Sequence, residues 1–148
     1  MTSETGIPGA ALERGRPFSG AKVALFLGAR LAVLQRDDIP GVPYPGLWDL
    51  PGGGREPGES PRDCVIRETA EELSLILRPR DFRHARAYRD QAGAEVWFWT
   101  ARLPPACVAK IRLGDEGQGW ALMPPRAYLA HPAHIPPLAA RLRRVLGG

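Results

Sequence analysis

Features that mark export, membrane insertion or a disulfide-built fold are scarce in this sequence. It has two cysteines in 148 residues, Cys64 and Cys107, and two cysteines make no disulfide framework. Its longest apolar run, residues 23–27, is far shorter than the roughly 20 residues that cross a bilayer. No apolar segment of signal-peptide length precedes Lys22. We therefore expect a reduced, cytoplasmic setting, no export signal and no membrane partner.

Internal repeats, low-complexity tracts and a large charge of either sign are missing too. The formal net charge is +4, from 20 Lys and Arg against 16 Asp and Glu. An excess this small suits an anionic substrate but is no strong evidence for nucleic-acid binding. The chain is long enough for one domain with its own core, and its hydrophobic fraction of 44% is ordinary for such a domain. Nothing in the sequence indicates the oligomeric state.

Apolar periodicity predicts an α/β domain that follows a short tail. Residues 1–20 are small, polar and punctuated by Gly and Pro, and we expect them to be a flexible N-terminal tail. Residues 21–148 are expected to form a single domain with a mixed sheet and helices. Strands are predicted over residues 22–27, 30–35, 47–50, 81–89, 94–103 and 118–123, and helices over residues 60–73, 124–130 and 136–146.

Two of these segments have distinct faces. On the strand over residues 94–103, Trp97 and Trp99 share one face and Phe98 takes the other, so these aromatics are expected mainly in the core. The last helix is amphipathic. It places Leu138, Leu142 and Val145 on one side, with Arg141, Arg143 and Arg144 mostly outside.

The helix over residues 60–73 gathers carboxylates along one side. Ser60 is suited to cap its N-terminus, and Pro61 to its first position, where a missing N–H costs nothing. At about 100° per residue, Glu68, Glu71 and Glu72 lie at i, i+3 and i+4 on one narrow stripe. The helix therefore packs one side and presents three acidic groups on the other.

Three neighbouring carboxylates repel one another unless a cation lies among them. Arg67 can pair with Glu71 at i+4, but a surface pair of this orientation contributes little. A divalent cation would compensate more charge. All candidate ligands are oxygens, which selects Mg²⁺ or Mn²⁺ and implies substrate phosphates as further ligands. The alternative is an ordinary solvated face of a glutamate-rich helix.

The order of these residues resembles the Nudix box, the motif of Nudix hydrolases. That pattern is Gly, five residues, Glu, seven residues, Arg-Glu, an apolar residue, any residue, Glu-Glu, any residue, Gly and an apolar residue. Two positions depart from it, because Thr69 replaces the usual apolar residue and Ser74 the usual closing Gly. Ser74 must then end the helix without the easy positive φ of glycine. The matching residues are Gly53, Glu59, Arg67, Glu68, Glu71, Glu72 and Leu75.

The resemblance implies the Nudix α/β/α sandwich, a mixed β-sheet between helices. It also implies hydrolysis of a diphosphate linkage in a nucleoside diphosphate joined to another group, X, with Mg²⁺ as cofactor. In the family, Glu68, Glu71 and Glu72 match metal ligands and Arg67 matches the arginine that orients them. The backbone carbonyl that matches Gly52 joins the metal ligands. Gly53 and Glu59 match supporting positions.

Outside the box, WDLPGG, EVWFWTARL and DEGQGWALMPPRAYL resemble the MutT branch, the nucleoside triphosphate pyrophosphohydrolases. By this resemblance Glu116 is a metal ligand and candidate base, with its neighbour Asp115 as the competitor. Arg36 matches phosphate-contacting arginines. His134 stands near the place of an Asn that reads the base, and Tyr44 is a candidate substrate contact from a proline-rich loop.

Other members of the family suggest alternatives to a triphosphate pyrophosphohydrolase. One is a Nudix-like module that senses a nucleotide without cleaving it, although such modules usually lose box glutamates. Others are hydrolases of dinucleoside polyphosphates, ADP-ribose or RNA 5′ ends. The last would want a broad basic groove, for which the arginines at residues 141–144 are too few. The sequence identifies neither the base, nor X, nor the attacked phosphorus.

Overall fold

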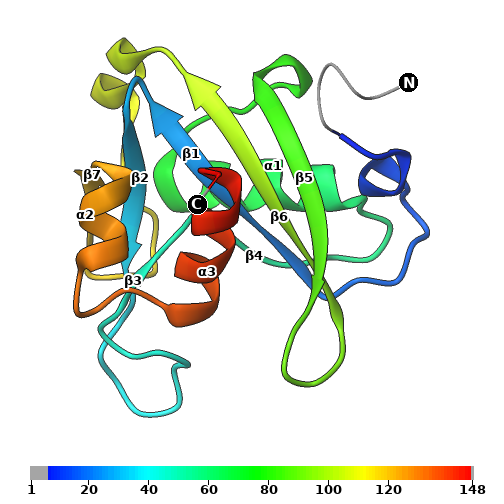
Figure 1. Ribbon diagram of the computed structural model, residues 1–148, viewed down its shortest axis with the longest axis horizontal. Helices are drawn as coiled ribbons and strands as arrows, with labels where there is room; N and C mark the ends of the chain where they lie inside the picture. Colours follow the sequence, from blue (N-terminus) through cyan, green and yellow to red (C-terminus); the bar gives the residue numbers. More distant parts are fainter. Residues whose placement is uncertain (1–6, 148) are drawn as a thin grey trace.

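A computed structural model describes residues 7–147 and shows a seven-stranded mixed sheet between helices (Figure 1). The strands are β1 (Gly20–Leu27), β2 (Arg30–Gln35), β3 (Trp48–Asp49), β4 (Gly52–Gly54), β5 (Phe82–Arg89), β6 (Glu95–Leu103) and β7 (Gly119–Met123). The α-helices are α1 (Pro61–Leu73), α2 (Pro125–Ala130) and α3 (Pro136–Val145), and short 3₁₀ turns are η1 (Gly9–Leu12), η2 (Pro79–Asp81) and η3 (Pro105–Lys110). No helix among the described residues is long and apolar enough to cross a bilayer.

The first two strands part soon after their hairpin, and two short strands lie between them. β1 and β2 are paired only near the turn, Phe26 with Leu31 and Leu27 with Arg30. Beyond that point β3 pairs with β2 and β4 pairs with β1. The other edge of β1 pairs in parallel with β6, whose far neighbour is β5, and β7 pairs with the other edge of β2. The segment that carries β3 and β4 is thereby held in the middle of the sheet.

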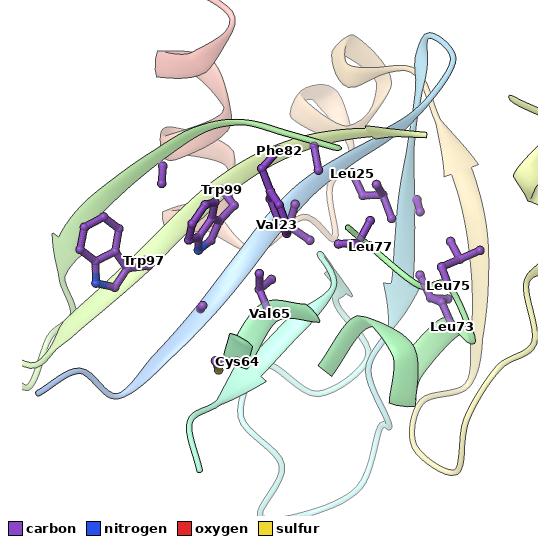
Figure 2. Packing of buried hydrophobic residues seen from close by; sticks show 14 of the residues in the cluster. Val23, Leu25, Cys64, Val65, Leu73, Leu75, Leu77, Phe82, Trp97 and Trp99 are labelled. Atoms are coloured by element: carbon purple, nitrogen blue, oxygen red, sulfur yellow. The ribbon is translucent and has the colours of Figure 1, made fainter. Parts of the chain in front are cut away.

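Alternate side chains of the central strands supply two separate cores. Figure 2 shows the core beneath α1, and the second core lies under α2 and α3 on the other face of the sheet. The first contains Val23, Leu25, Trp97 and Trp99 with Cys64, Val65 and Leu73 from α1. The second contains Ala24, Phe26 and Phe98 with Tyr128, Leu138 and Leu142 from α2 and α3. The α/β/α sandwich and the opposite placement of the β6 aromatics are therefore confirmed.

The ends of the predicted strands and helices fall within two residues of the observed ones. Four elements were not expected. Gly52–Gly54, predicted as part of a turn, forms β4, and the 3₁₀ turns η1, η2 and η3 were not anticipated. These pieces are too short to show a hydrophobic period. β4 is defined by its pairing with β1, and the 3₁₀ turns by local backbone hydrogen bonds.

The N-terminal segment differs from the flexible tail predicted for residues 1–20. Residues 1–6 lie outside the described part of the chain, but from Ile7 onward the segment packs on the body. Ile7, Ala11 and Phe18 are buried members of the core beneath α1. The Arg55 guanidinium lies 4.8 Å from the Phe18 ring centre, and Arg16 is paired with Glu95 at 2.7 Å. Three widely spaced apolar residues suffice to anchor this segment to the core, but they create no helical or strand periodicity in the sequence.

Ser74 ends α1 in the left-handed conformation that glycine normally supplies. Its φ is 62° and ψ is 23°, and its N–H donates to Ala70 O at 3.0 Å. The Ser74 hydroxyl donates to Arg112 O at 3.2 Å. The same segment donates Arg112 N–H to Leu73 O and Gly114 N–H to Glu72 O, each at 3.0 Å. Residues 112–114 therefore satisfy carbonyls that the end of a helix leaves free.

Replacing Phe18 with Ala should lower the free energy of unfolding by about 3 to 5 kcal/mol, because a large side chain is removed from a packed core. Leu12→Ala is the matched control, since Leu12 is 41% exposed. Its effect should stay within about 0.5 kcal/mol. Chemical denaturation of the three proteins measures both values. Equal, small losses would show that the N-terminal segment does not contribute to the core in solution.

Ser74→Gly should raise the free energy of unfolding by about 0.5 to 1 kcal/mol. The change removes the β-carbon penalty of the left-handed conformation, which exceeds the loss of one exposed hydroxyl contact. Ser74→Ala loses the hydroxyl, keeps the β-carbon and should be less stable than the parent. The prediction is wrong if thermal unfolding ranks the glycine variant below Ser74.

Candidate metal and phosphate site

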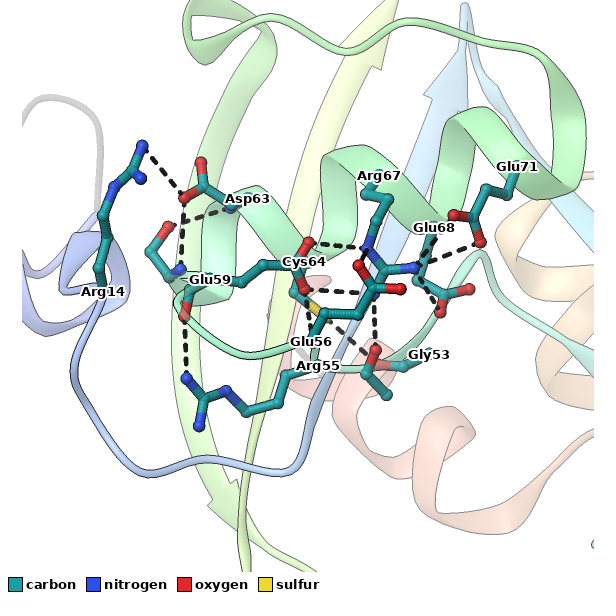
Figure 3. A network of polar contacts seen from close by, with 12 residues as sticks. Arg14, Gly53, Arg55, Glu56, Glu59, Asp63, Cys64, Arg67, Glu68 and Glu71 are labelled. Atoms are coloured by element: carbon teal, nitrogen blue, oxygen red, sulfur yellow. Dashed lines mark hydrogen bonds and ion pairs between the residues drawn. The ribbon is translucent and has the colours of Figure 1, made fainter.

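Arg67 is the centre of the polar network on α1 (Figure 3). Its Nε donates to Glu59 Oε2 at 2.7 Å, and one terminal nitrogen donates to Gly54 O at 2.8 Å. The other terminal nitrogen lies 3.3 Å from Glu68 Oε2 and 3.2 Å from Glu71 Oε2. The hydrogen bond with Glu59 raises the pKa of Arg67 above its ordinary value, so the guanidinium stays charged. One side chain thus links the helix, the preceding loop and the glycine turn.

Glu59 is held as a carboxylate just ahead of the helix. Its Oε1 accepts from the Glu56 backbone N–H at 2.8 Å. Partial burial raises the pKa of Glu59, but hydrogen bonds from Arg67 and Glu56 outweigh that effect, and the pKa ends below its ordinary value. The expected cap is present as well, because Ser60 Oγ accepts from Asp63 N–H at 3.1 Å and Asp63 returns the contact. The start of α1 is therefore fixed by local bonds.

Glu68 lies directly against the backbone of the glycine turn. A β-carbon placed on Gly53 would come within 2.7 Å of both carboxylate oxygens of Glu68. Only glycine lets the carboxylate approach the turn this closely. Burial raises the pKa of Glu68. The carboxylate is thus partly withdrawn from water beside the Gly53 backbone.

Glu72 lies deeper, one turn further along α1. Its Oε1 accepts from the Gly52 N–H at 2.9 Å. Burial raises the pKa of Glu72 to about 7, although the positive charge of Lys22 acts in the opposite direction. Gly52 has a φ of 131°, and a β-carbon there would lie 2.1 Å from Ala21 O, so the position requires glycine. The first and last glutamates of the stripe therefore both face the turn.

The structure adds two site residues that sequence reasoning missed, Lys22 and Asp49. Lys22 Nζ donates to Asp49 Oδ2 and to Gly52 O, each at 2.9 Å. Asp49 Oδ2 also accepts from a terminal nitrogen of Arg36 at 2.9 Å, and Arg36 Nε donates to Pro43 O at 2.6 Å. Two signals in the sequence could have identified them: a lysine in a largely buried strand, and an aspartate between Trp48 and Leu50. Their pairing joins positions 27 residues apart and has no local signature.

A cleft of about 630 Å³ opens on the same side of the sheet as α3. Lys22, Arg36 and Tyr44 line it, together with Gly53 and Gly54 from the turn and Arg141 from α3. The glutamates are not among its lining residues, but no side chain of Gly53 stands between the Glu68 carboxylate and the cleft. The turn therefore separates an acidic helix from a cationic cleft by backbone alone.

Of the three predicted substrate contacts, the structure places two in the cleft and one outside it. Arg36 and Tyr44 line the cleft, and Tyr44 is 41% exposed. His134 does not line the cleft. Its ring packs 5.9 Å from the Tyr128 ring, and its Nδ1 is buried without a hydrogen-bond partner among the described residues. Base reading by His134 therefore has no support from this arrangement and stays a prediction.

Glu116 and its competitor Asp115 are both exposed in the loop before β7. The loop begins at Gly114, whose N–H is bonded to Glu72 O, and ends at Gly117, whose N–H donates to Asp37 Oδ2 at 3.1 Å. A β-carbon on Gly114 would lie 2.1 Å from a carbonyl of α1, so this close approach needs glycine. Both acids thus lie just beyond the C-terminal end of α1, and either remains a candidate.

The donor set fits a hard divalent ion, although the carboxylates are engaged with protein groups here. Among residues 7–147 no three His, Cys, Asp or Glu side chains are grouped closely enough to hold one ion. Arg67 engages Glu68 and Glu71, and the Gly52 carbonyl accepts from Lys22 instead. Glu68, Glu72 and the turn carbonyls nevertheless offer only oxygen donors beside a close glycine backbone, which suits Mg²⁺ or Mn²⁺.

Most of the chain is similar to known proteins. A model of the NUDIX domain matches residues 17–145. An uncharacterized Nudix hydrolase of Pseudomonas aeruginosa is 36% identical over 89 residues, which are 57% of this chain and 50% of that protein. Nucleoside triphosphatase NudI of Escherichia fergusonii is 36% identical over 110 residues, 67% of this chain and 75% of that protein. The match thus spans half the length of the first relative and three quarters of the second.

Two solved structures show the same fold at low sequence identity. A MutT protein from Methanosarcina mazei Go1 has a TM-score of 0.68 at 20% identity, covering 87% of this chain and 93% of that one. A C. elegans Ap4A hydrolase in a binary complex has a TM-score of 0.68 at 22% identity, covering 86% and 96%. At such identities the likeness establishes the arrangement of strands and helices.

Gly53→Ala should weaken divalent metal binding roughly tenfold or more, because the new methyl displaces the Glu68 carboxylate from the turn. The displaced group is the flexible end of a side chain, so thermal stability should change little. Gly54→Ala is the matched control, since its β-carbon would meet only Ser19 O at 3.8 Å. Mn²⁺ titration by calorimetry measures the affinity. Equal Mn²⁺ affinities in both variants would show that Glu68 is not part of the metal site.

Proposed function

Because the chain belongs to the Nudix family, we propose that it is a Mg²⁺-dependent hydrolase of a diphosphate linkage in a nucleoside diphosphate derivative. Mn²⁺ is the proposed substitute ion. The favoured substrate is a nucleoside triphosphate, which would give the monophosphate and pyrophosphate. The observation that carries this proposal is the placement of Glu68 and Glu72 against the glycine turn of a cationic cleft. The name of the NudI relative, a nucleoside triphosphatase, supports the triphosphate over other nucleotides.

Each residue around the turn has a distinct role in this proposal. Glu68, Glu71, Glu72 and the Gly52 carbonyl would hold the metal, which supplies charge neutralisation at the phosphoryl oxygens when bound. Arg67 orients the glutamates through the contacts described above. Glu116 or Asp115 would add a ligand or a base from the loop anchored to the end of α1.

Lys22 and Arg36 form the fixed cationic side of the site. Their bonds to Asp49 hold both side chains at the wall of the cleft, next to the turn. Preorganised positive groups of this kind stabilise charge that develops on phosphoryl oxygens without reorganising during the reaction. Binding of a nucleotide in the cleft would place its phosphates between these cations and the α1 carboxylates.

A non-catalytic nucleotide sensor is the rival proposal, and retention of every box glutamate weighs against it. Dinucleoside polyphosphates, ADP-ribose and RNA 5′ ends remain alternative substrates to be tested beside triphosphates. We also propose a reduced, cytoplasmic setting. Both cysteines are free thiols, and burial raises the pKa of Cys64 to about 12, which makes that thiol unreactive.

Glu68→Gln and Glu72→Gln should each lower turnover roughly 100-fold or more, since each removes a charged ligand while keeping the side-chain shape. Glu13→Gln is the control, because Glu13 is exposed and its ion-pair partner is Arg16 rather than a residue of the site. Chromatography of the products released from nucleoside triphosphates, dinucleoside polyphosphates, ADP-ribose and nucleotide sugars, with and without Mg²⁺, measures the effect. Metal-independent release, or parental rates in both variants, would overturn the hydrolase proposal.

A further inference from the structure

Arg141 does not lie where the helical pattern predicted. The sequence places it mostly outside α3, but its side chain is half-buried and lines the cleft. Its guanidinium carbon lies 4.7 Å from the centre of the Tyr88 ring. This cation–π contact holds the guanidinium over the ring while leaving its N–H groups free to donate. The last helix thus brings an oriented cation into the cleft.

Arg141 differs from the other three cationic residues of the cleft in having no acceptor. Lys22 and Arg36 are bonded to Asp49 and to backbone carbonyls, and Arg89 donates to Gly93 O at 3.0 Å. Among residues 7–147, Arg141 makes no hydrogen bond or ion pair. Asp90 is near enough to influence its charge, but Asp90 Oδ1 is occupied by the N–H groups of Ala92 and Ala94, each at 2.9 Å.

A half-buried cation without a partner costs free energy unless a ligand completes it. Burial lowers the pKa of Arg141, which shows the loss of hydration, while Tyr88, Asp90 and Tyr44 act in the opposite direction. A planar guanidinium with unused donors is suited to two parallel bonds with a phosphoryl or carboxylate group. An uncompensated group of this kind, facing a nucleotide-sized cleft, indicates an anion-binding position.

We propose that Arg141 binds an anionic group of the substrate beyond the two phosphoryl groups at the α1 site. This inference rests on the proposed function and deepens it. The two phosphorus atoms that flank the cleaved bridge would be neutralised by the metal, Lys22 and Arg36. A third phosphoryl group needs its own partner, and Arg141 offers one from α3. The substrate class is then nucleotides with three or more phosphoryl groups, in preference to ADP-ribose or nucleotide sugars, which carry two.

The test compares binding of tri- and diphosphates in the absence of turnover. ATP, GTP, ADP and GDP are titrated into the whole protein in EDTA by calorimetry. Arg141→Met keeps an apolar stem over Tyr88 but removes the charge. It should weaken triphosphate binding about tenfold to a hundredfold and diphosphate binding less than about threefold. Arg141→Lys, which keeps the charge and loses the fork, should lie between the two. Arg143→Met, an exposed position on the same helix, should change neither affinity.

Three results would overturn the inference. One is equal weakening of di- and triphosphates in Arg141→Met, which would assign Arg141 to the base, the ribose or the packing of α3. Another is unchanged affinity for both. The third is a parent protein that binds triphosphates no more tightly than diphosphates, or not at all. Because none of these readouts requires hydrolysis, they are separate from a failure of the proposed function, which would be seen as absence of metal-dependent hydrolysis.

Discussion

The structure of the site depends on a single guanidinium, that of Arg67, which collects the carboxylates around it. An isolated surface ion pair contributes little, but this side chain is only 21% exposed and meets Glu59, which is 14% exposed, through both Nε and a terminal nitrogen. The same group reaches Gly54 O, Glu68 and Glu71. It offsets repulsion along α1 and fixes the helix to the glycine turn, and the positions of Glu68 and Gly53 follow from that attachment.

The sheet makes this attachment possible by parting at its centre. Because β1 and β2 separate beyond their hairpin, β3 and β4 occupy the space between them and bring Asp49 and the glycine turn beside Lys22. A central position restrains the turn from both sides, whereas a surface loop would lack this restraint. The close contacts of Gly52 with β1 and of Gly53 with Glu68 are consequences of this insertion. The result is a thin backbone layer with carboxylates on one side and cations on the other.

What the sequence predicts well here is local, and what it misses is distant in the chain. The Ser60 cap and the glutamate stripe follow from spacings within one helix, and the alternation of Trp97, Phe98 and Trp99 follows from one strand. The packed segment from Ile7, the pairing of Lys22 with Asp49 and the placement of Arg141 depend on which elements become neighbours. A helical wheel assigned Arg141 to the outside because it contains no information about the cleft beside α3.

Net charge is a poor guide to this molecule for the same reason. The formal value of +4 is an average over an acidic helix and a cationic cleft that the fold keeps apart. Within the cleft the balance is again local, since one carboxylate, Asp49, serves both Lys22 and Arg36 and fixes them in place. A phosphate chain that enters therefore meets cations whose positions are already set. The attraction for an anionic substrate arises from this spatial separation of charge, which the sequence total does not reveal.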